Sequence, residues 1–517
     1  MTSIGKAIAR HARGGAFLAP IFVLGLVLRL YDVGAESIWV DELSSIQRAR
    51  WSLPELISDV SQSVHPPLYF VILHYWVSLF GDSEFAARLP SAIFGVLALP
   101  AVYLVGERLF SRRAGTSSAL ILSVSLFHIS WSQEARGYTL MVLLALASMY
   151  FFIRILESGR RALRVGYVLA SCLLIYTHYY GMLVLAAQTA YICLLAASSE
   201  RPRGVNVSAF LLLQAAVGMS YLPWATLFLR QFLRVQSGYW IPAPTTRSIL
   251  DSFIEYTGYR RTLLLGLLAL ASLSVVAWSK VRGRFDWRNA LASIGEYAWS
   301  VRVLNARENL LLVLWLTVPI AIPFLVSRVS TPIYYTRYTI AASVAFYILA
   351  ARGIDNIRST LVRSLAILFV VGVSLASVRD YYVDTWKREW RGAAGYIDRS
   401  AKPGDLLLFN DAGESSVFAY YSKRTELITQ GFDLEGRLVT EQTPRDEPLG
   451  IERLGSAVAG YSRVWLILAN TNDRKGLIKK GLQERYRLVD LNRAYQGIEI
   501  YLFRREDAGM SRSLPGE

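Results

Sequence analysis

Residues 16–47 read AFLAPIFVLGLVLRLYDVGAESIWVDELSSIQ, and this stretch decides the fold. It opens with an apolar run over residues 16–32 that approaches the length needed to cross a bilayer. The acidic pair Asp41-Glu42 follows shortly afterwards, just past the expected membrane boundary. An acidic pair at the mouth of a membrane protein is a candidate for proton chemistry on a substrate that arrives through the lipid.

The whole chain has the composition of a membrane protein. Of its 517 residues 53% are hydrophobic and 18% are charged, and the mean hydropathy is +0.34. Ordinary soluble domains do not reach these values. Further apolar runs lie at residues 90–108, 115–131, 139–156, 165–179, 181–197, 208–228, 262–279, 310–326, 338–352 and 361–377. Together these runs predict a polytopic α-helical membrane protein with about eleven transmembrane helices.

The first apolar run resembles a signal peptide, but two features favour a retained span. Arg29 and Tyr31 follow the run, and no small-residue cleavage site appears. We therefore expect the N-terminus to stay on the cytoplasmic side of the membrane.

The net charge of +16 does not indicate a nucleic-acid partner, because the positive charges are distributed as a membrane topology requires. Positive charge concentrates in every second connection, namely those with Arg108/Arg112/Arg113, Arg154/Arg160/Arg161/Arg164, Arg201/Arg203, Lys280/Arg282/Arg284/Arg288 with Arg302/Arg307, and Arg352/Arg358/Arg363. Under the positive-inside rule these connections face the cytoplasm, which puts the C-terminal end outside. The composition and the lack of targeting signals favour a prokaryotic inner (plasma) membrane.

Residues 66–80 complicate the count of spans, because they are apolar enough to cross the membrane. A span there would invert every later connection against its charges. Pro66, Pro67 and the short length favour a juxtamembrane or partly immersed helix instead. Residues 31–89 then form one external loop, in which the amphipathic stretch 51–64 lies along the interface.

The chain divides into a transmembrane domain at residues 1–378 and a small extracytoplasmic α/β domain at residues 379–517. The second part leaves the membrane pattern: EWRGAAGYIDRS and SSVFAYYSK predict helices, and DLLLFN, RVWLILAN and IEIYLFRR predict strands. We predict that this domain supports acceptor handling or stability.

Four motifs now carry a family resemblance. They are the Asp41-Glu42 pair, HPPLYF at 65–70 with FGDSEFAARLPSAIFGVLALPAVYLVGERLF at 80–110, SQEARGYTLMVLLALASM at 132–149, and YYTRYTIAASVAF at 334–346. In order and spacing the chain resembles the protein O-mannosyltransferase/aminoarabinose-transferase group, which are GT-C membrane glycosyltransferases of family 39. It departs from the group at Thr139-Leu140, where members often have an Asp, and some members have KPP in place of HPP.

The resemblance implies a polyprenyl-phosphate sugar donor held in the membrane lipid and an acceptor hydroxyl outside the cytoplasm. It also implies inversion at the anomeric carbon, and the acceptor is a protein, a lipid or a glycan. Such a donor is already activated, so the reaction needs a base for the hydroxyl and cations for the departing phosphate.

Asp41 is the predicted base, because a carboxylate within hydrogen-bond reach takes the hydroxyl proton as the new bond forms. Glu42 is the second predicted catalytic residue and orients the acceptor or its neighbours. The alternative is structural: the pair lies at the start of ELSSIQRARW and suits the N-terminus of a helix.

Arginine suits the phosphate, because its planar fork binds phosphate bidentately and keeps its charge. The predicted phosphate-binding residues are Arg88, Arg136, Arg337 and Tyr338. Interfacial anchoring is the alternative for each of them, since arginines and tyrosines are common at membrane boundaries.

The remaining candidates lie in the other predicted external segments. The predicted substrate-binding residues are His65, Glu134, His178, Tyr179, Tyr239, Trp240 and Tyr335. The loop over residues 229–261 is a predicted lid. A divalent metal held by Glu42 or Glu134 with the histidines stays open, although no short ligand spacing supports it.

Two other functional classes compete with glycosyl transfer. A transporter or flippase would place charges along a path at mid-bilayer depth, whereas these acidic and histidine residues gather at one face. A glycan polymerase or ligase also uses lipid-linked sugar, but the first-loop Asp-Glu pair with an appended α/β domain is not expected there.

Overall fold

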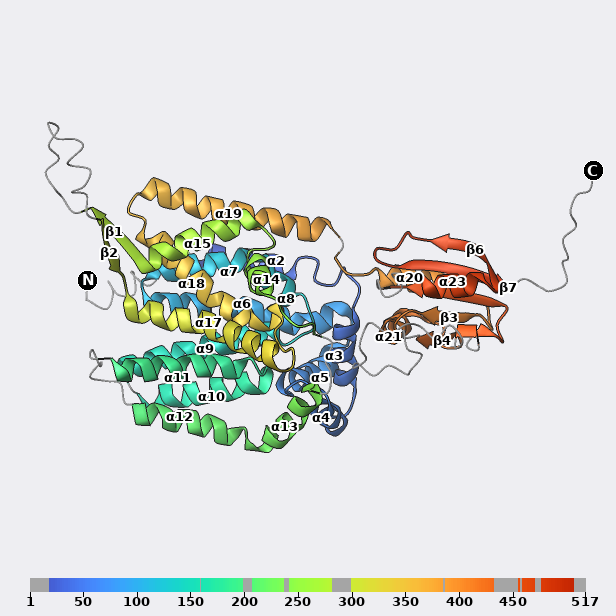
Figure 1. Cartoon of the computed structure of the whole chain (residues 1–517), viewed down its shortest axis with the longest axis horizontal. Helices are drawn as coiled ribbons and strands as arrows, with labels where there is room; N and C mark the ends of the chain where they lie inside the picture. The colour runs from blue at the N-terminus through green and yellow to red at the C-terminus, as the bar shows by residue number, and fades with distance from the viewer. Residues whose placement is uncertain are drawn as a thin grey trace, which may run out of the picture.

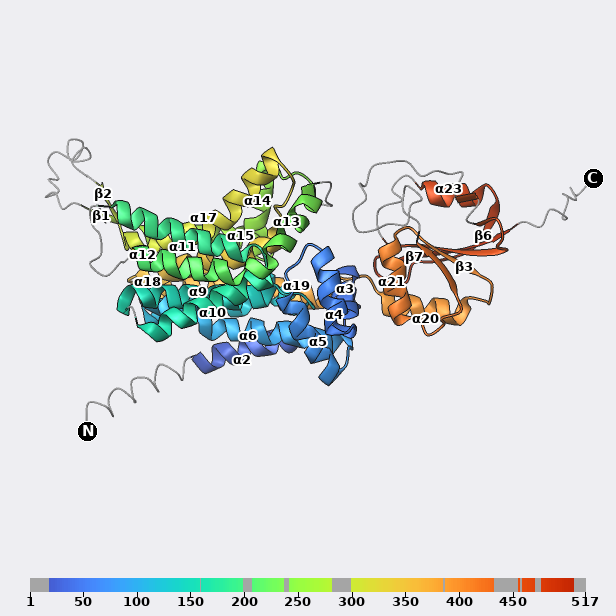
Figure 2. The same ribbon diagram turned by 90° about the horizontal axis from the view of Figure 1, so that it is seen from below.

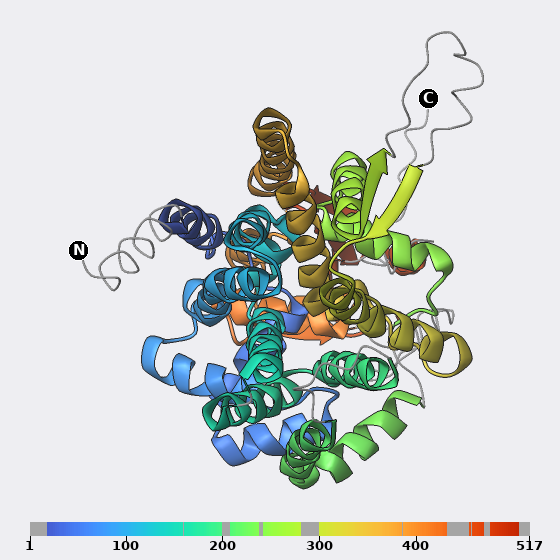
Figure 3. The same cartoon turned by 90° about the vertical axis from the view of Figure 1, so that its left-hand side faces the viewer.

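The computed structural model describes residues 18–158, 160–198, 207–236, 241–280, 299–384, 386–431, 454–455, 458–469 and 476–505. In this part of the chain a long helical bundle carries a small α/β domain at one end (Figure 1). Figure 3 looks along the bundle and shows its helices almost end-on.

Helices occupy every apolar run that the sequence predicts. They are α2 (Leu18–Leu30), α6 (Glu84–Leu109), α7 (Arg112–Val124), α8 (Leu126–Ser132), α9 (Tyr138–Ser158), α10 (Arg161–Thr177), α11 (Gly181–Ala197), α12 (Val207–Ser220), α13 (Leu222–Gln236), α15 (Arg261–Val275), α17 (Ala306–Val329), α18 (Ile340–Asn356) and α19 (Thr360–Val383). Among the described residues, four helices (α6, α9, α17 and α19) are long and apolar enough to cross a membrane alone. Two bent pairs, α7–α8 and α12–α13, raise that number to six. The chain is therefore a multi-pass membrane protein, and the count of about eleven spans stays a prediction.

Both bends interrupt a predicted span. The α7 and α8 axes differ by 60° around Ser125, whose backbone is extended and whose Oγ lies 3.0 Å from the Tyr347 hydroxyl oxygen. The α12 and α13 axes differ by 72°. Pro223, the second residue of α13, explains this second break, because proline has no N–H to continue the hydrogen-bond ladder of α12.

The predicted span at 262–279 is too long. Helix α15 ends at Val275, and the strand β1 (Val276–Lys280) pairs antiparallel with β2 (Trp299–Val303). Two successive valines and Trp278 favour a strand over continued helix.

Three short helices lie at the end of the bundle that faces the α/β domain (Figures 1 and 2). They are α3 (Val40–Arg50), α4 (Leu53–Gln62) and α5 (Leu68–Phe80). A Ser52–Glu55 capping box starts α4, in the stretch predicted to be amphipathic. Helix α5 has 13 residues, or about 20 Å, against about 30 Å of bilayer core. This length agrees with the juxtamembrane interpretation of residues 66–80.

The α/β domain contains a five-stranded sheet in the order β4-β3-β5-β7-β6. Its strands are β3 (Leu406–Phe409), β4 (Ile428–Gly431), β5 (Arg463–Leu468), β6 (Tyr486–Asn492) and β7 (Glu499–Arg505). Strand β3 pairs in parallel with β4 and β5, and β7 pairs antiparallel with β5 and β6. Helices α20 (Trp390–Ser400) and α21 (Ala412–Tyr421) cover one face and α23 (Leu477–Gln483) covers the other (Figure 2). The predicted helices and strands are present, whereas β4, β6 and α23 were not predicted.

The core of this domain continues into the bundle. Ile38, Leu43 and Ile46 at the start of the bundle belong to the same buried cluster as Trp390 and Phe418. The two parts are thus joined by apolar packing as well as by the chain.

The close approach of α15 and α18 gives the first prediction. A Cβ at Gly353 would lie 1.7 Å from the carbonyl oxygen of Leu270, a backbone atom that cannot move aside cheaply. We expect Gly353→Ala to destabilise the bundle by about 1–3 kcal/mol and to lower the melting temperature in detergent. The control is Gly372→Ala on α19, where a Cβ meets nothing within 4 Å. That change should leave the melting temperature equal or higher, and equal melting of both variants would contradict the packing.

Candidate active site at the domain junction

The predicted site residues come from distant segments and meet at the end of the bundle that faces the α/β domain. Asp41 lies in the first turn of α3, and Arg136 lies in the connection between α8 and α9. Arg337 lies in the 3-10 helix η3 (Thr336–Thr339), which leads into α18. Asp41 is not the N-cap of α3, because Trp39 holds that position, so capping does not explain this carboxylate.

Asp41 and Arg337 form the centre of the site. Asp41 Oδ2 lies 3.3 Å from Arg337 Nη2. The Asp41 side chain is 30% exposed and the Arg337 side chain is 9% exposed. The carboxylate therefore has open space on one side, while the guanidinium is largely enclosed.

Aromatic rings enclose the Arg337 guanidinium. Its Cζ lies 4.9–5.8 Å from the ring centroids of Trp39, Trp131, Tyr335 and Tyr338. Rings at this distance stabilise a cation and hold its plane in place. The predicted residues Tyr335 and Tyr338 are thus neighbours of Arg337.

Arg136 fixes the start of α3 and holds His65. Its Nη1 donates to the Asp41 carbonyl oxygen at 3.2 Å, and its Nη2 lies 3.2 Å from His65 Nε2. Burial, with help from Arg136 and Arg48, holds the pKa of His65 well below its usual value. His65 is therefore a neutral imidazole that accepts from Arg136.

Glu42 has a different environment from Asp41, although the two are adjacent. It is fully buried and accepts from the Ala135 N–H at 3.0 Å and from Lys387 Nζ at 3.0 Å. Arg88 binds it with a fork, Nε to Oε1 at 2.7 Å and Nη2 to Oε2 at 2.8 Å. Burial opposes the charge, but Arg88 and Lys387 outweigh it and lower the pKa of Glu42.

These contacts correct two predictions. Arg88 also donates to the carbonyl oxygens of Val33, Glu36 and Ser37, so all its N–H groups are engaged within the protein. It has no donor left for a phosphate, and Glu42 has no open face for a substrate. Both residues position the start of α3 instead.

Glu134 forms a second carboxylate site next to the first. It lies 3.0 Å from Lys387 Nζ and accepts a hydrogen bond from Trp39 Nε1. Burial raises the pKa of Glu134, although the Lys387 ammonium acts in the opposite direction. Among the described residues, no three of His, Cys, Asp and Glu lie close enough together to hold a metal ion.

An apolar cavity of about 260 Å³ is lined by Tyr338, one of the rings around Arg337. The predicted residues His65, His178, Tyr179 and Tyr338 line it, together with α13 and Ile241 from the predicted lid. Burial, with Arg136 and Arg337, lowers the pKa of His178 to about 3, so this imidazole is neutral. The predicted substrate-binding residues of the lid, Tyr239 and Trp240, lie outside the described residues.

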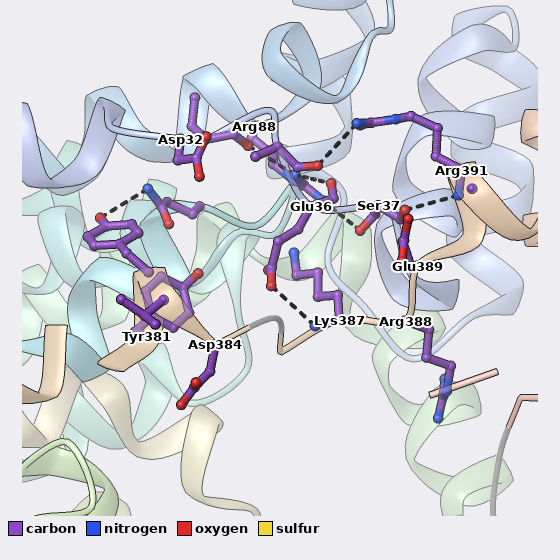
Figure 4. Close-up of a pocket in the computed structure, with 16 residues that line it drawn as sticks. Asp32, Glu36, Ser37, Arg88, Tyr381, Asp384, Lys387, Arg388, Glu389 and Arg391 are labelled. Atoms are coloured by element: carbon purple, nitrogen blue, oxygen red, sulfur yellow. Dashed lines mark hydrogen bonds between the residues drawn. The ribbon is translucent and has the colours of Figure 1, made fainter. Parts of the chain in front are cut away.

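A polar cleft lies where the bundle meets the α/β domain, and we call it the junction cleft. It consists of two cavities of about 440 and 480 Å³ that share Glu36, Tyr381, Lys387 and Arg388 as lining residues. Figure 4 shows the first cavity. Trp39 and Glu134 line the second, so the cleft reaches the ring that covers Arg337.

The sequence reasoning missed Trp39 and Lys387. Trp39 stands two residues before Asp41, and Lys387 stands in the basic, aromatic run WKREWR directly after the last helix of the bundle. Aromatic and basic residues next to a membrane boundary are usually interfacial anchors, so nothing in the sequence separately indicates that these two lie at the site.

Comparison with known proteins shows what the fold resembles. Residues 64–241 match the model of the Dolichyl-phosphate-mannose-protein mannosyltransferase family. No curated protein sequence matches the chain. The structure of ArnT from Cupriavidus metallidurans in the apo state superposes with a TM-score of 0.58 at 14% identity, covering 96% of this chain and 98% of that one.

Two further structures share the fold. ArnT from the same organism bound to undecaprenyl phosphate gives a TM-score of 0.56 at 13% identity, covering 97% of this chain and 98% of that one. The Archaeoglobus fulgidus oligosaccharyltransferase tethered with an acceptor peptide gives 0.53 at 11% identity, with 96% and 74% of the chains covered. The chain resembles the GT-C glycosyltransferases of the mannosyltransferase and ArnT group. The resemblance predicted from the motifs is confirmed.

The buried pair of Arg88 and Glu42 gives the second prediction. Arg88→Met removes the fork and leaves a buried carboxylate with less compensation, which costs about 3–5 kcal/mol. We expect a lower melting temperature in detergent, measured by scanning fluorimetry. The double variant Glu42→Gln/Arg88→Met removes both charges and should recover part of the loss. Unchanged melting with weaker binding of a polyprenyl phosphate would instead support Arg88 as a phosphate ligand.

Proposed function

We propose that this chain is an inverting glycosyltransferase that moves a sugar from a polyprenyl-phosphate donor to an acceptor hydroxyl on the extracytoplasmic membrane face. The GT-C fold, the family match over residues 64–241 and the undecaprenyl phosphate bound to ArnT support it. One observation carries the proposal: the partly open Asp41 carboxylate lies 3.3 Å from the enclosed Arg337 guanidinium, and two of the rings around this guanidinium line cavities, Tyr338 the apolar cavity and Trp39 the junction cleft.

The two cavities suit two substrates. Tyr338 lines the apolar cavity and Trp39 lines the junction cleft, and the Arg337 guanidinium lies against both rings. The apolar cavity fits the first units of a polyprenyl chain, and Arg337 fits the phosphate. The polar junction cleft fits the acceptor.

The sugar enters between Asp41 and Arg337, so their 3.3 Å contact opens when the donor binds. The acceptor oxygen then approaches the sugar from the Asp41 side, opposite the phosphate on the Arg337 side. The oxygen forms a bond to the anomeric carbon as the bond from that carbon to the phosphate oxygen breaks. Asp41 takes the hydroxyl proton, and the phosphate leaves with the bonding electron pair beside Arg337. A single displacement of this kind inverts the anomeric carbon.

The orientation of the protein supports an extracytoplasmic site. Helix α8 ends and α9 begins at the site, so the basic residues Arg112, Arg160 and Arg161 lie at the far end of the bundle. Positive charge at that end favours a cytoplasmic location for it. We therefore place Asp41 and the α/β domain outside, in a bacterial-type inner membrane with a cytoplasmic N-terminus.

A transporter or flippase is the second candidate, and the distribution of charge disfavours it. The candidate residues Asp41, Glu134, Arg136 and Arg337 are linked by direct contacts or through Trp39 in one cluster of the described residues, and they do not follow a path through the bundle. A polymerase or ligase would share the lipid-linked donor and differs in its acceptor.

The base gives the third prediction. Asp41→Asn keeps the size of the side chain and removes its ability to take a proton. We expect transfer from a polyprenyl-phosphate sugar to fall by about 10²–10⁴, or about 3–5 kcal/mol of barrier. Radiolabelled sugar transfer in detergent or proteoliposomes measures it. Asp490→Asn, in the α/β domain, is the matched control and should retain activity. Transfer at the wild-type rate by Asp41→Asn would exclude Asp41 as the base.

Lys387 gives the fourth prediction, which concerns pH. Burial raises the pKa of Glu134, and the Lys387 ammonium acts against this rise. Lys387→Met should therefore raise that pKa further, so that Glu134 takes up its proton at higher pH and holds Trp39 less well. We expect the acidic limb of the pH–rate profile to move to higher pH.

The control for this prediction is Lys387→Arg, which keeps a cation between the two carboxylates and should leave the acidic limb close to that of the wild type. A uniform loss of rate at every pH in Lys387→Met, with no shift of the limb, would contradict the role of Lys387 in holding Glu134 ionised.

A further inference from the structure

Two exposed aromatic rings stand at the rim of the junction cleft. Tyr259 and Trp386 both line it and are 56% and 53% exposed. Their ring centroids lie 6.1 Å apart with an angle of 25° between the planes. Tyr381, deeper in the cleft, lies 6.1 Å from the Trp386 ring. Exposed aromatic side chains are common near a membrane boundary, but these two stack on each other where they line a cleft, and together they offer a contact surface for a ligand.

The backbone at Tyr259 supports this conclusion. Tyr259 has φ +63°, in the left-handed region that a bulky residue rarely adopts. The N–H of Tyr259 donates to the Ile254 carbonyl at 2.9 Å, which fixes this conformation after α14 (Thr246–Tyr256). A glycine would adopt it without strain. A tyrosine at this position indicates that its ring is needed in the cleft.

Trp386 is held in place through its backbone. The N–H groups of Trp386 and Lys387 both donate to Glu36 Oε1, at 2.7 and 3.3 Å. Figure 4 shows Glu36 reaching the chain at Lys387. The linker that carries the exposed indole is therefore fixed to the bundle, which presents the ring at a set position.

The charged side chains that line the cleft indicate what kind of ligand it binds. Each described cationic side chain that lines the cleft is paired with a carboxylate: Arg88 with Glu42, Lys387 with Glu42 and Glu134, Arg388 with Glu414, and Arg391 with Glu84. Every described cation of the cleft is thus already paired with a carboxylate of the protein, which disfavours a phosphate or a carboxylate as the ligand. Asp32 and Glu389 also line it, and carboxylate oxygens accept hydrogen bonds from hydroxyl groups.

We propose that the junction cleft binds an uncharged saccharide as the acceptor, with Trp386 and Tyr259 packed against the faces of its rings. The inference rests on the proposed function and names the acceptor of that same site. A pyranose ring carries apolar C–H faces that pack on aromatic rings and hydroxyl groups that reach polar side chains. The cations of the cleft are already neutralised by carboxylates, whereas the two exposed rings offer their faces to a neutral sugar ring.

The position of the rings also links the cleft to the base. Tyr259 and Trp386 line the same cavity as Trp39 and Glu134. Trp39 covers Arg337, which pairs with Asp41. This series of contacts connects the rim of the cleft to Asp41.

Direct binding to the full chain in detergent tests the inference. The probes are neutral manno-, gluco- and galacto-tetrasaccharides, the same tetrasaccharides carrying one phosphate, and a threonine-containing peptide, with binding measured by saturation-transfer NMR and calorimetry. We expect at least one neutral tetrasaccharide to bind. Binding of only the phosphorylated or peptide probes, or of no probe, would overturn the inference.

The rings are tested by matched variants. Trp386→Ala and Tyr259→Gly should each weaken saccharide binding by about tenfold, as removal of a stacking side chain does in other ring-binding sites. Tyr259→Gly suits the positive φ, so a loss of binding cannot come from backbone strain. Trp386→Phe keeps a ring and should bind nearly as the wild type does. Tyr75→Ala, an exposed ring outside the cleft, should change nothing. Equal binding by every variant would contradict the proposal.

Donor turnover separates this inference from the proposed function. Release of polyprenyl phosphate from a polyprenyl-phosphate sugar is measured with each probe as acceptor. If the wild type never consumes the donor, the proposed function fails. If the wild type consumes the donor and glycosylates only a phosphorylated or peptide probe, the function stands and the saccharide inference fails.

Discussion

The structure of the site depends on the burial of one carboxylate. Glu42 leaves water completely, which is costly for a charged group unless hydrogen bonds and opposite charges replace the solvent. The Arg88 fork, the Lys387 ammonium and the Ala135 N–H supply them. These partners come from α6, from the domain linker and from the connection between α8 and α9, so one side chain ties three separate segments to α3.

The contacts of Glu42 explain how the short helix α3 is held in a fixed orientation. Once Glu42 is held, the orientation of α3 is set, and Asp41 and Trp39 have fixed positions beside Arg337. Lys387 contributes from the segment that leads into the α/β domain, and it bridges Glu42 to Glu134. The α/β domain therefore takes part in building the site, and its buried core with Ile38 and Leu43 holds the linker against the bundle.

Much of this could be predicted, and the limits have physical causes. The apolar runs predicted the helices because the bilayer imposes a minimum length, and the short run at residues 66–80 stood out for the same reason. The convergence of Asp41, Arg136 and Arg337 was predicted from motifs. The pairing of Arg88 with Glu42 was not predicted. The two residues are 46 positions apart, and an arginine that binds phosphate cannot be told in sequence from one that pairs with a buried carboxylate. Neither bend was predicted. Pro223 gives a sequence reason for the bend between α12 and α13, whereas no proline lies at the bend around Ser125.

Asp41 and Glu42 have different environments because of helix geometry. Successive residues of an α-helix point about 100° apart, so two adjacent carboxylates in one turn cannot face the same environment. On α3 one direction leads into the protein and the other toward the open space beside Arg337. Glu42 takes the first direction and is 0% exposed, and the Asp41 side chain takes the second and is 30% exposed. The longer side chain reaches the arginine and the lysine inside, and the shorter one stays close to the backbone at the edge of the site. A fully buried carboxylate and a partly open one can therefore be adjacent in the chain without competing for the same cations.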